Sequence, residues 1–238
     1  MSVLWDSLEK FEVTYVKRCK VKKKKKVDLM KVVRTHIFCG QLCKNCEYGC
    51  DKETELCTGK CNPGWDGPTC SRRNVALGQR TTQSSVYTEL GFSFVSRLAV
   101  DGRTGHMFFN KPYTCSHTET NPQPAFWTVT LDGEYSVYRF RIYNRNDVNC
   151  SLCYRRLNGF TLSVGSSSQN YKDCYHDTTT AQSGPGNIIT KTCVNGPIFG
   201  NTVKIMITNS EALTLCEVQI FAFSTCEESH EVSLLQVN

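Results

Sequence analysis

The sequence has no run of apolar residues long enough to cross a membrane as a helix, which takes about 20 residues. We therefore expect no direct insertion into a membrane. The N-terminus also has no basic segment followed by an apolar core, because Met1 is soon followed by the polar sequence WDSLEKFE, so no signal peptide is seen. No amphipathic helix is evident after residue 74, which favours an all-β fold there.

The sequence also lacks the closely spaced sets of Cys-x-x-Cys pairs that are typical of zinc modules, although it has 15 cysteines among 238 residues. Its two such pairs, Cys43 with Cys46 and Cys150 with Cys153, lie far apart and in different contexts. Most other cysteines are spread singly along the chain, which favours disulfide bonds. Disulfides persist in oxidising compartments, so we expect an extracellular protein, either secreted or the ectodomain of a membrane protein.

The positive charge of the chain is local. The formal net charge is +6, and most of the excess lies between Lys17 and Arg34. Such a segment can act as a polyanion-binding arm, but we interpret residues 1–38 as a solvated, disordered basic segment and expect no nucleic-acid partner. The odd number of cysteines leaves at least one thiol unpaired, and Cys19 and Cys226 are the candidates.

Residues 39–70 hold seven cysteines with hardly any apolar run. Such a module depends on cross-links, each of which contributes about 2–4 kcal/mol. In CTGKCNPGWDGPTC, Gly64 and Gly67 allow tight turns, and Cys61 and Cys70 close the final loop. This segment resembles the last half of an EGF-like module, which we interpret as a spacer without a calcium site. The pairing of the upstream cysteines stays open: Cys39, Cys43, Cys46 and Cys50.

Residues 74–223 show short segments in which apolar side chains alternate with polar ones. In one of them, Tyr138, Phe140 and Ile142 are expected on one face, with Arg139 and Arg141 opposite. The same period of two recurs in three further segments: Phe160, Leu162 and Val164; Val203, Ile205 and Ile207; Val218, Ile220 and Ala222. Loops rich in Gly, Asn, Ser and Pro separate them. This pattern predicts an all-β antiparallel sandwich, followed by a tail at 224–238.

Four polar residues fall at the ends of alternating segments, where loops carry binding groups: His117, Arg145, Asp147 and Arg156. Two guanidiniums and an imidazole offer several fixed donors. They can clamp an anion or donate to sugar hydroxyls, and Asp147 can hold the guanidiniums in place. The alternative is a surface salt bridge set beside a core-edge histidine.

The segments NVALGQRTTQSSVY, AVDGRT, CSHTE, FWTVTL, YNRND, RRLNGFTLSVG and LTLCEVQIF occur in this order. Together they resemble the fucolectin (F-type lectin) family, which has a discoidin-like jelly-roll fold. The resemblance covers nearly all of residues 74–223. It implies binding of fucosylated glycans through His117, followed after 27 residues by Arg145, and then Asp147.

The family's last basic contact corresponds to Arg156 or, alternatively, Arg155, after a loop of eight residues that is longer than the family's. Within this loop, Cys150 and Cys153 correspond to a disulfide that packs on the sugar. The resemblance also places two aromatic side chains against the apolar sugar face, where the fucose methyl lies: Phe108 and Phe109. Burying that methyl contributes roughly 1 kcal/mol, so the polar residues must set most of the specificity.

The resemblance further implies a structural Ca²⁺ held by six residues: the carbonyls of Leu98, Arg103 and Cys216, the side chains of Asp101 and Glu217, and the carbonyl and hydroxyl of Thr114. Oxygen ligands with two carboxylates suit calcium. The alternative is that Asp101 only caps the DGRT turn. The implied disulfides are Cys115–Cys216 and Cys174–Cys193.

We therefore predict a calcium-stabilised, fucose-binding lectin of the recognition or innate-defence type, not an enzyme. An enzyme would use His117 as base with Asp147 as its orienting group, or Cys150 and Cys153 as a redox pair, but no nucleophile motif or cofactor loop accompanies them. A second alternative is an adhesion or scavenger-receptor-like ectodomain that binds protein or phospholipid without fucose specificity. A homo-oligomer is compatible with the sequence.

Overall fold

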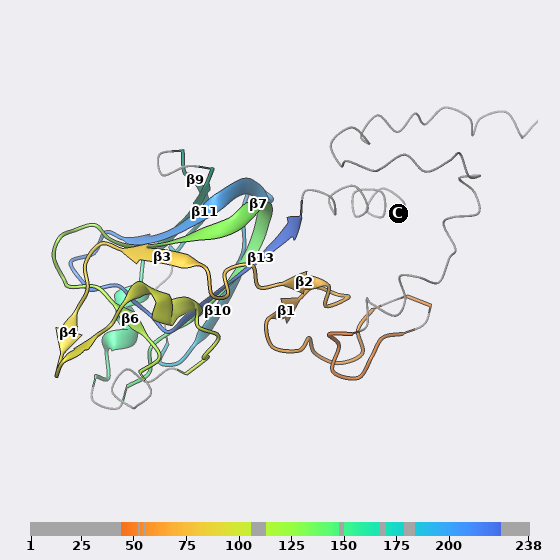
Figure 1. Ribbon diagram of the computed structural model, residues 1–238, viewed down its shortest axis with the longest axis horizontal. Helices are drawn as coiled ribbons and strands as arrows, with labels where there is room; N and C mark the ends of the chain where they lie inside the picture. Colours follow the sequence, from red (N-terminus) through yellow and green to blue (C-terminus); the bar gives the residue numbers. More distant parts are fainter. Residues whose placement is uncertain are drawn as a thin grey trace, which may run out of the picture. The chain divides into compact units, whose positions relative to one another are not determined.

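Antiparallel strands are the main regular secondary structure of the described chain, as predicted (Figure 1). The computed structural model describes residues 44–51, 53–54, 56–105, 113–147, 150–166, 170–178 and 184–224. All of these lie within one compact unit, Ile37–Thr225. Two short 3₁₀ segments, η2 (Ser96–Val100) and η3 (Cys153–Leu157), interrupt the strands. Among the described residues, no helix has the length and apolar character needed to span a membrane.

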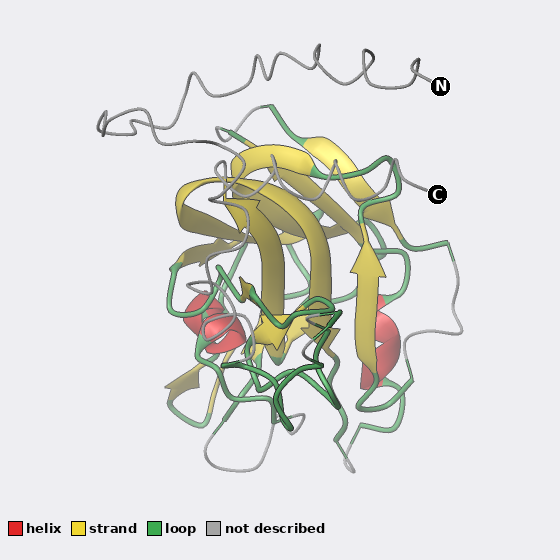
Figure 2. Ribbon diagram, turned by 90° about the vertical axis from the view of Figure 1, so that its right-hand side faces the viewer, coloured by secondary structure: helices red, strands yellow, loops and turns green. Residues whose placement is uncertain are grey.

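The main sheet is organised around the long strand β7 (Ala125–Tyr143). Its first half pairs with β3 (Arg80–Gln83), and its second half pairs with β13 (Glu217–Ser224) and β10 (Ile188–Thr192). Strand β11 (Ile198–Ile207) runs along both halves of β7. Beyond it lie β8 (Thr161–Gly165) and β9 (Lys172–His176). Figure 2 shows these strands curving past one another, with loops gathered at their ends.

The core follows the predicted alternation with one exception. The apolar residues at 160, 162 and 164, at 203, 205 and 207, and at 218, 220 and 222 are all buried. In β7, however, Tyr138 does not join Phe140 and Ile142 in the core, and Val137 does. The register of β13 shifts here, between Phe221 and Ala222. This bulge changes which side chains face inward, so the prediction for Tyr138 was wrong.

Four expected disulfides form in the structure: Cys61–Cys70, expected from the cysteine-rich segment itself, and the three that the resemblance implies, Cys115–Cys216, Cys150–Cys153 and Cys174–Cys193. In the cysteine-rich segment, Cys46 also pairs with Cys57, and Cys50 is disulfide-bonded as well. Gly64 and Gly67 have φ angles of 82° and 93°, the left-handed turn conformation expected of them. Cys19 and Cys226, the candidates for an unpaired thiol, lie outside the described residues.

A buried carboxylate joins the cysteine-rich segment to the sandwich. Asp66 lies in β1 (Trp65–Asp66), which pairs with β2 (Arg72–Arg73). Its carboxylate accepts a 2.7 Å hydrogen bond from the hydroxyl of Tyr138 and lies 3.3 and 3.4 Å from guanidinium nitrogens of Arg139 and Arg141. Arg72 adds a cation–π contact with Tyr138, 4.6 Å from the ring centre. Tyr138 therefore has a polar partner outside the core.

Candidate functional site

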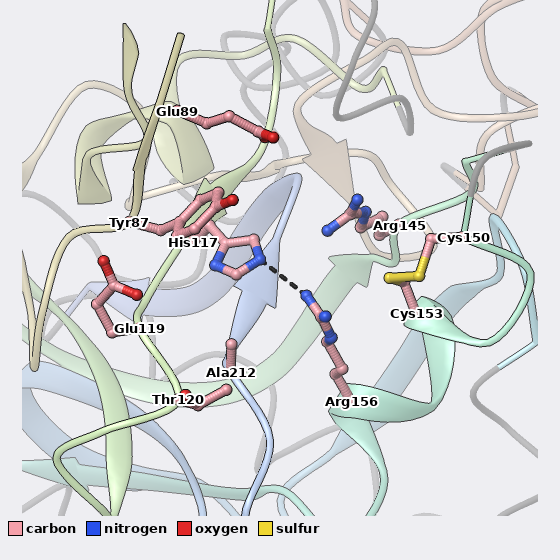
Figure 3. A pocket seen from close by; sticks show the side chains of 10 residues that line it. All are labelled: Tyr87, Glu89, His117, Glu119, Thr120, Arg145, Cys150, Cys153, Arg156 and Ala212. Carbon is pink, nitrogen blue, oxygen red and sulfur yellow. Dashed lines mark hydrogen bonds between the residues drawn. A yellow bond between two sulfur atoms is a disulfide. The ribbon is translucent and has the colours of Figure 1, made fainter. Parts of the chain in front are cut away.

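An open cavity of about 380 Å³ lies where several strands end (Figure 3). It brings together residues from β6 (Ser116–His117), from the loop after β7, from η3 and from the hairpin of β4 (Thr88–Glu89) and β5 (Phe92–Ser93). The lining residues are Tyr87, Glu89, His117, Glu119, Thr120, Arg145, Cys150, Cys153, Arg156 and Ala212. Three of the four polar residues selected from the sequence therefore line one cavity, and the fourth, Asp147, bonds to one of them.

Arg145 and Asp147 form a buried ion pair at the end of β7. The guanidinium Nε of Arg145 donates to Asp147 Oδ2, and the two side chains are only 3% and 2% exposed. The neighbouring Asn144 accepts a hydrogen bond from the Arg145 backbone N–H and donates to the Tyr154 carbonyl at 3.0 Å. Burial lowers the pKa of Arg145, and Asp147 opposes this effect. The pair thus fixes one guanidinium at the cavity wall.

His117 is a neutral hydrogen-bond acceptor in this site. Its pKa is lowered to about 3, chiefly by burial and also by the charges of Arg156 and Arg145, whereas a bond to the Thr118 carbonyl acts in the opposite direction. That bond, at 2.5 Å from Nδ1, places the ring proton on Nδ1. The lone pair of Nε2 therefore accepts from Nη1 of Arg156, 2.8 Å away. The ring of Tyr87 packs beside the imidazole at 4.6 Å between ring centres.

The structure places Arg156, and not Arg155, in the cavity. Arg155 is exposed and lies over the ring of Tyr154, 5.7 Å from its centre. Arg156 bonds to His117, and its Nε lies 3.5 Å from Glu211 Oε2. Asn209 holds this turn from a distant segment, because its amide donates to the Arg156 carbonyl at 3.4 Å.

The disulfide between Cys150 and Cys153 forms part of the cavity wall (Figure 3). Backbone hydrogen bonds from Cys150 to the Asp147 carbonyl and from Cys153 to the Cys150 carbonyl, both 3.2 Å, shape this turn. It therefore presents an apolar sulfur surface beside Arg145. The two aromatics expected to complete the apolar contact, Phe108 and Phe109, lie outside the described residues.

Comparison with known proteins identifies the family of the chain. A family model described as "NedA-like, galactose-binding domain" matches residues 98–205. Fucolectin-2 of Anguilla japonica is 31% identical over 153 residues, which are 63% of this chain and 79% of that protein. The chain belongs to the fucolectin family.

Solved structures support the fold of this fucolectin. The F-lectin from striped bass serum (Morone saxatilis) is 25% identical, with a TM-score of 0.54 over 64% of this chain. The chain spans about half, 48%, of that longer protein. A fucose-binding module of Streptococcus pneumoniae is also 25% identical, with a TM-score of 0.50 over 63% of this chain and 98% of the module. The predicted β-sandwich of the discoidin and F-type lectin kind is confirmed.

Glu217, a member of the implied calcium set, lies apart from the residues that line this cavity. Glu217 is fully buried, and its Oε2 accepts a 3.2 Å hydrogen bond from the Gly102 N–H. Its Oε1 has no hydrogen-bond partner among the described residues. The pKa of Glu217 is raised to about 8, chiefly by burial and also by the charge of Asp101, whereas the bond from Gly102 acts in the opposite direction. A buried carboxylate oxygen without a donor fits a cation ligand.

Two other residues of the implied calcium set are linked directly to Glu217: Cys216 precedes it in the chain, and the charge of Asp101 acts on its pKa. Asp101 ends η2, which contains Leu98, and its Oδ1 accepts from the Arg103 N–H at 2.9 Å, so it also caps the turn. Thr114 is buried and precedes Cys115, whose disulfide to Cys216 joins this strand to the one that carries Glu217. The donor set is all oxygen and includes two carboxylates, which fits calcium chemistry.

Several cavity residues were not predicted from the sequence: Tyr87, Glu89, Glu119, Thr120 and Ala212, together with Glu211 beside Arg156. Glu119 and Thr120 follow His117 closely in the chain, and Glu119 belongs to the CSHTE segment, so their position near the site had a local signal. The other four reach the site because the β4–β5 hairpin and the segment before β12 (Thr214–Leu215) pack beside β6, where Thr214 pairs with His117. This long-range pairing leaves no local signal in the sequence.

Proposed function

We propose that this chain is a calcium-stabilised lectin domain that binds glycans ending in fucose. The observation that carries the proposal is the convergence of His117 Nε2, Arg145 and Arg156 in one open cavity, with the Cys150–Cys153 disulfide in its wall. This is the set of groups that the family resemblance implies for sugar binding.

The geometry explains how a sugar would be held. Sugar hydroxyls both donate and accept hydrogen bonds. Nε2 of His117 can accept from one, and the guanidiniums of Arg145 and Arg156 can donate to others. In the protein without ligand, Arg156 donates to His117 directly. A hydroxyl inserted between them would exchange this bond for two, while the disulfide and the Tyr87 ring provide apolar surface.

The same geometry argues for binding over catalysis. Asp147 bonds to Arg145, whereas Nδ1 of His117 bonds to the Thr118 carbonyl, so Asp147 does not orient the imidazole. A pKa of about 3 makes His117 a weak base near neutral pH. Cys150 and Cys153 are bonded to each other. The adhesion or scavenger-receptor alternative, with protein or phospholipid as ligand, is not favoured, because the chain belongs to the fucolectin family.

Calcium would be held by Asp101, Glu217, Thr114 and the carbonyls of Leu98, Arg103 and Cys216. When bound, it would neutralise two carboxylates and supply a partner to Glu217 Oε1. The five described disulfides support an oxidising compartment and therefore a secreted or cell-surface protein. We further propose a role in recognition of the innate-defence type, with residues 39–70 as an EGF-like spacer module; a homo-oligomer is compatible with this role.

Calorimetric titration with L-fucose, with D-glucose as the control sugar, tests the proposal. Because hydrogen bonds to charged groups contribute about 1.5–3 kcal/mol, we expect Arg156→Ala to weaken fucose binding by about tenfold or more. The matched control is Arg155→Ala, since Arg155 is adjacent but exposed and outside the cavity. Equal losses in the two variants, or no fucose binding by the wild-type protein, would contradict the proposal.

A further inference from the structure

Two carboxylates and two guanidiniums line the cavity, and two further carboxylates lie against those guanidiniums, so negative charge exceeds positive charge in this set of described residues. Its positive groups are the guanidiniums of Arg145 and Arg156, and its imidazole, His117, is neutral at pH 7. Four carboxylates line it or bond to its arginines: Asp147, Glu211, Glu89 and Glu119. Two arginines would suggest an anion clamp, but the full set of groups does not form one.

The two carboxylates in excess lie on one side of the cavity. Asp147 bonds to Arg145, and Glu211 lies 3.5 Å from Arg156, so each of these carboxylates offsets one guanidinium. The remaining two are Glu89 and Glu119, of which Glu89 also interacts favourably with the charge of Arg145. Figure 3 shows them on the Tyr87 and His117 side of the cavity, across from the disulfide. Glu119 is exposed and Glu89 is half-buried, so both carboxylates lie at the rim.

We infer that Glu89 and Glu119 make this site selective for neutral fucosylated glycans and reject glycans that carry a carboxylate or sulfate beside the fucose. This inference rests on the proposed function. A glycan longer than one sugar must extend over the rim of an open cavity, where its next residues meet these two carboxylates. Repulsion between charges some 8 Å apart in screened surroundings weakens binding by about threefold for each carboxylate.

The test compares three glycans on the full chain by calorimetry or surface binding at low salt. The Lewis x trisaccharide is neutral, sialyl Lewis x adds one carboxylate, and the methyl ester of sialyl Lewis x keeps the added sugar but removes its charge. We expect sialyl Lewis x to bind about tenfold more weakly than its methyl ester, and added salt to narrow the difference. Glu89→Gln and Glu119→Gln should each narrow it by about threefold.

The control variant is Glu134→Gln, which removes an exposed carboxylate on β7 outside the cavity and should leave the ratio unchanged. Equal binding of sialyl Lewis x and its ester, or a ratio that the Glu89 and Glu119 changes do not alter, would overturn the inference while leaving fucose binding intact. If none of the three glycans binds and L-fucose also fails, the proposed function itself is wrong and the inference fails with it.

Discussion

The buried ion pair of Arg145 and Asp147 allows a sharp test of how the site is built. Asp147→Asn keeps a side-chain oxygen as acceptor but removes the negative charge that faces the guanidinium. Both side chains are almost fully buried, at 3% and 2% exposure. Breaking a buried pair by removing one charge typically costs about 3–5 kcal/mol. Glu89 also interacts favourably with the charge of Arg145, so we expect a loss of stability at the lower end of this range, about 3 kcal/mol.

Urea unfolding followed by tryptophan fluorescence measures this loss, because Trp127 is 1% exposed and reports on the core. For a unit of this size, about 3 kcal/mol corresponds to a melting temperature lower by roughly 6–12 °C. The control is Asp132→Asn, which breaks an exposed ion pair with Arg73 in which Asp132 is 49% exposed. Exposed pairs contribute less than about 1 kcal/mol.

A double variant separates charge from packing. If the loss in Asp147→Asn comes from the buried guanidinium, then replacing Arg145 by Gln in the same chain should restore part of the stability. Fucose binding should stay weak in the double variant, because a cavity donor has been removed. The reasoning is refuted if Asp147→Asn is no less stable than Asp132→Asn, or if the double variant loses the sum of the two single effects.

Four further predictions concern three other titratable groups: Glu217, His117 and Asp66. Calcium should raise the melting temperature and a chelator should reverse this, whereas Glu217→Gln should abolish the calcium response in the same thermal scans. Fucose binding should persist from pH 7 to about pH 5, because His117 stays neutral until its pKa of about 3; calorimetry across this range checks it. The unfolded chain takes up a proton at His117 near pH 6.5, so stability should fall as the pH drops from 6.5 towards 3, and His117→Gln should flatten this slope. Asp66→Asn should destabilise the protein by about 1–2 kcal/mol in urea unfolding, because its partners Arg139 and Arg141 are partly exposed.

The strands were largely predictable, because apolar and polar side chains must alternate along a strand that has one buried face. Leu162, Ile205 and Ile220 are all fully buried, as their period of two indicates. The failure at Tyr138 has a physical cause. A bulge in the pairing of β7 with β13 adds one residue to one strand, and the inward face then changes side. The sequence of β7 alone does not contain this information, because the bulge depends on the partner strand.

The sugar-binding groups were predictable in part. His117 ends β6 and Arg145 follows β7, and the resemblance to one fold indicated that these two strand ends lie in one cavity. The choice between Arg155 and Arg156 stayed open, because it depends on how η3 is turned. Asn209 holds that turn through the Arg156 carbonyl, from a segment far along the chain. Glu89 came to the rim through a hairpin whose position is likewise set by tertiary packing.

The proposed calcium site and the proposed sugar-binding site are joined by one small element, the pair of strands β6 and β12. Strands β6 and β12 pair His117 with Thr214 and Ser116 with Leu215, and the Cys115–Cys216 disulfide closes the end of this pair. Glu217 follows directly in the chain. A cation held by Glu217 would therefore order the end of the ladder that carries the imidazole, without contacting the sugar. Without a cation, Glu217 Oε1 is buried and has no hydrogen-bond partner among the described residues, which destabilises the same end of the β6–β12 pair. On this reasoning, calcium would act on fucose affinity through the position of His117 and not as a ligand of the glycan.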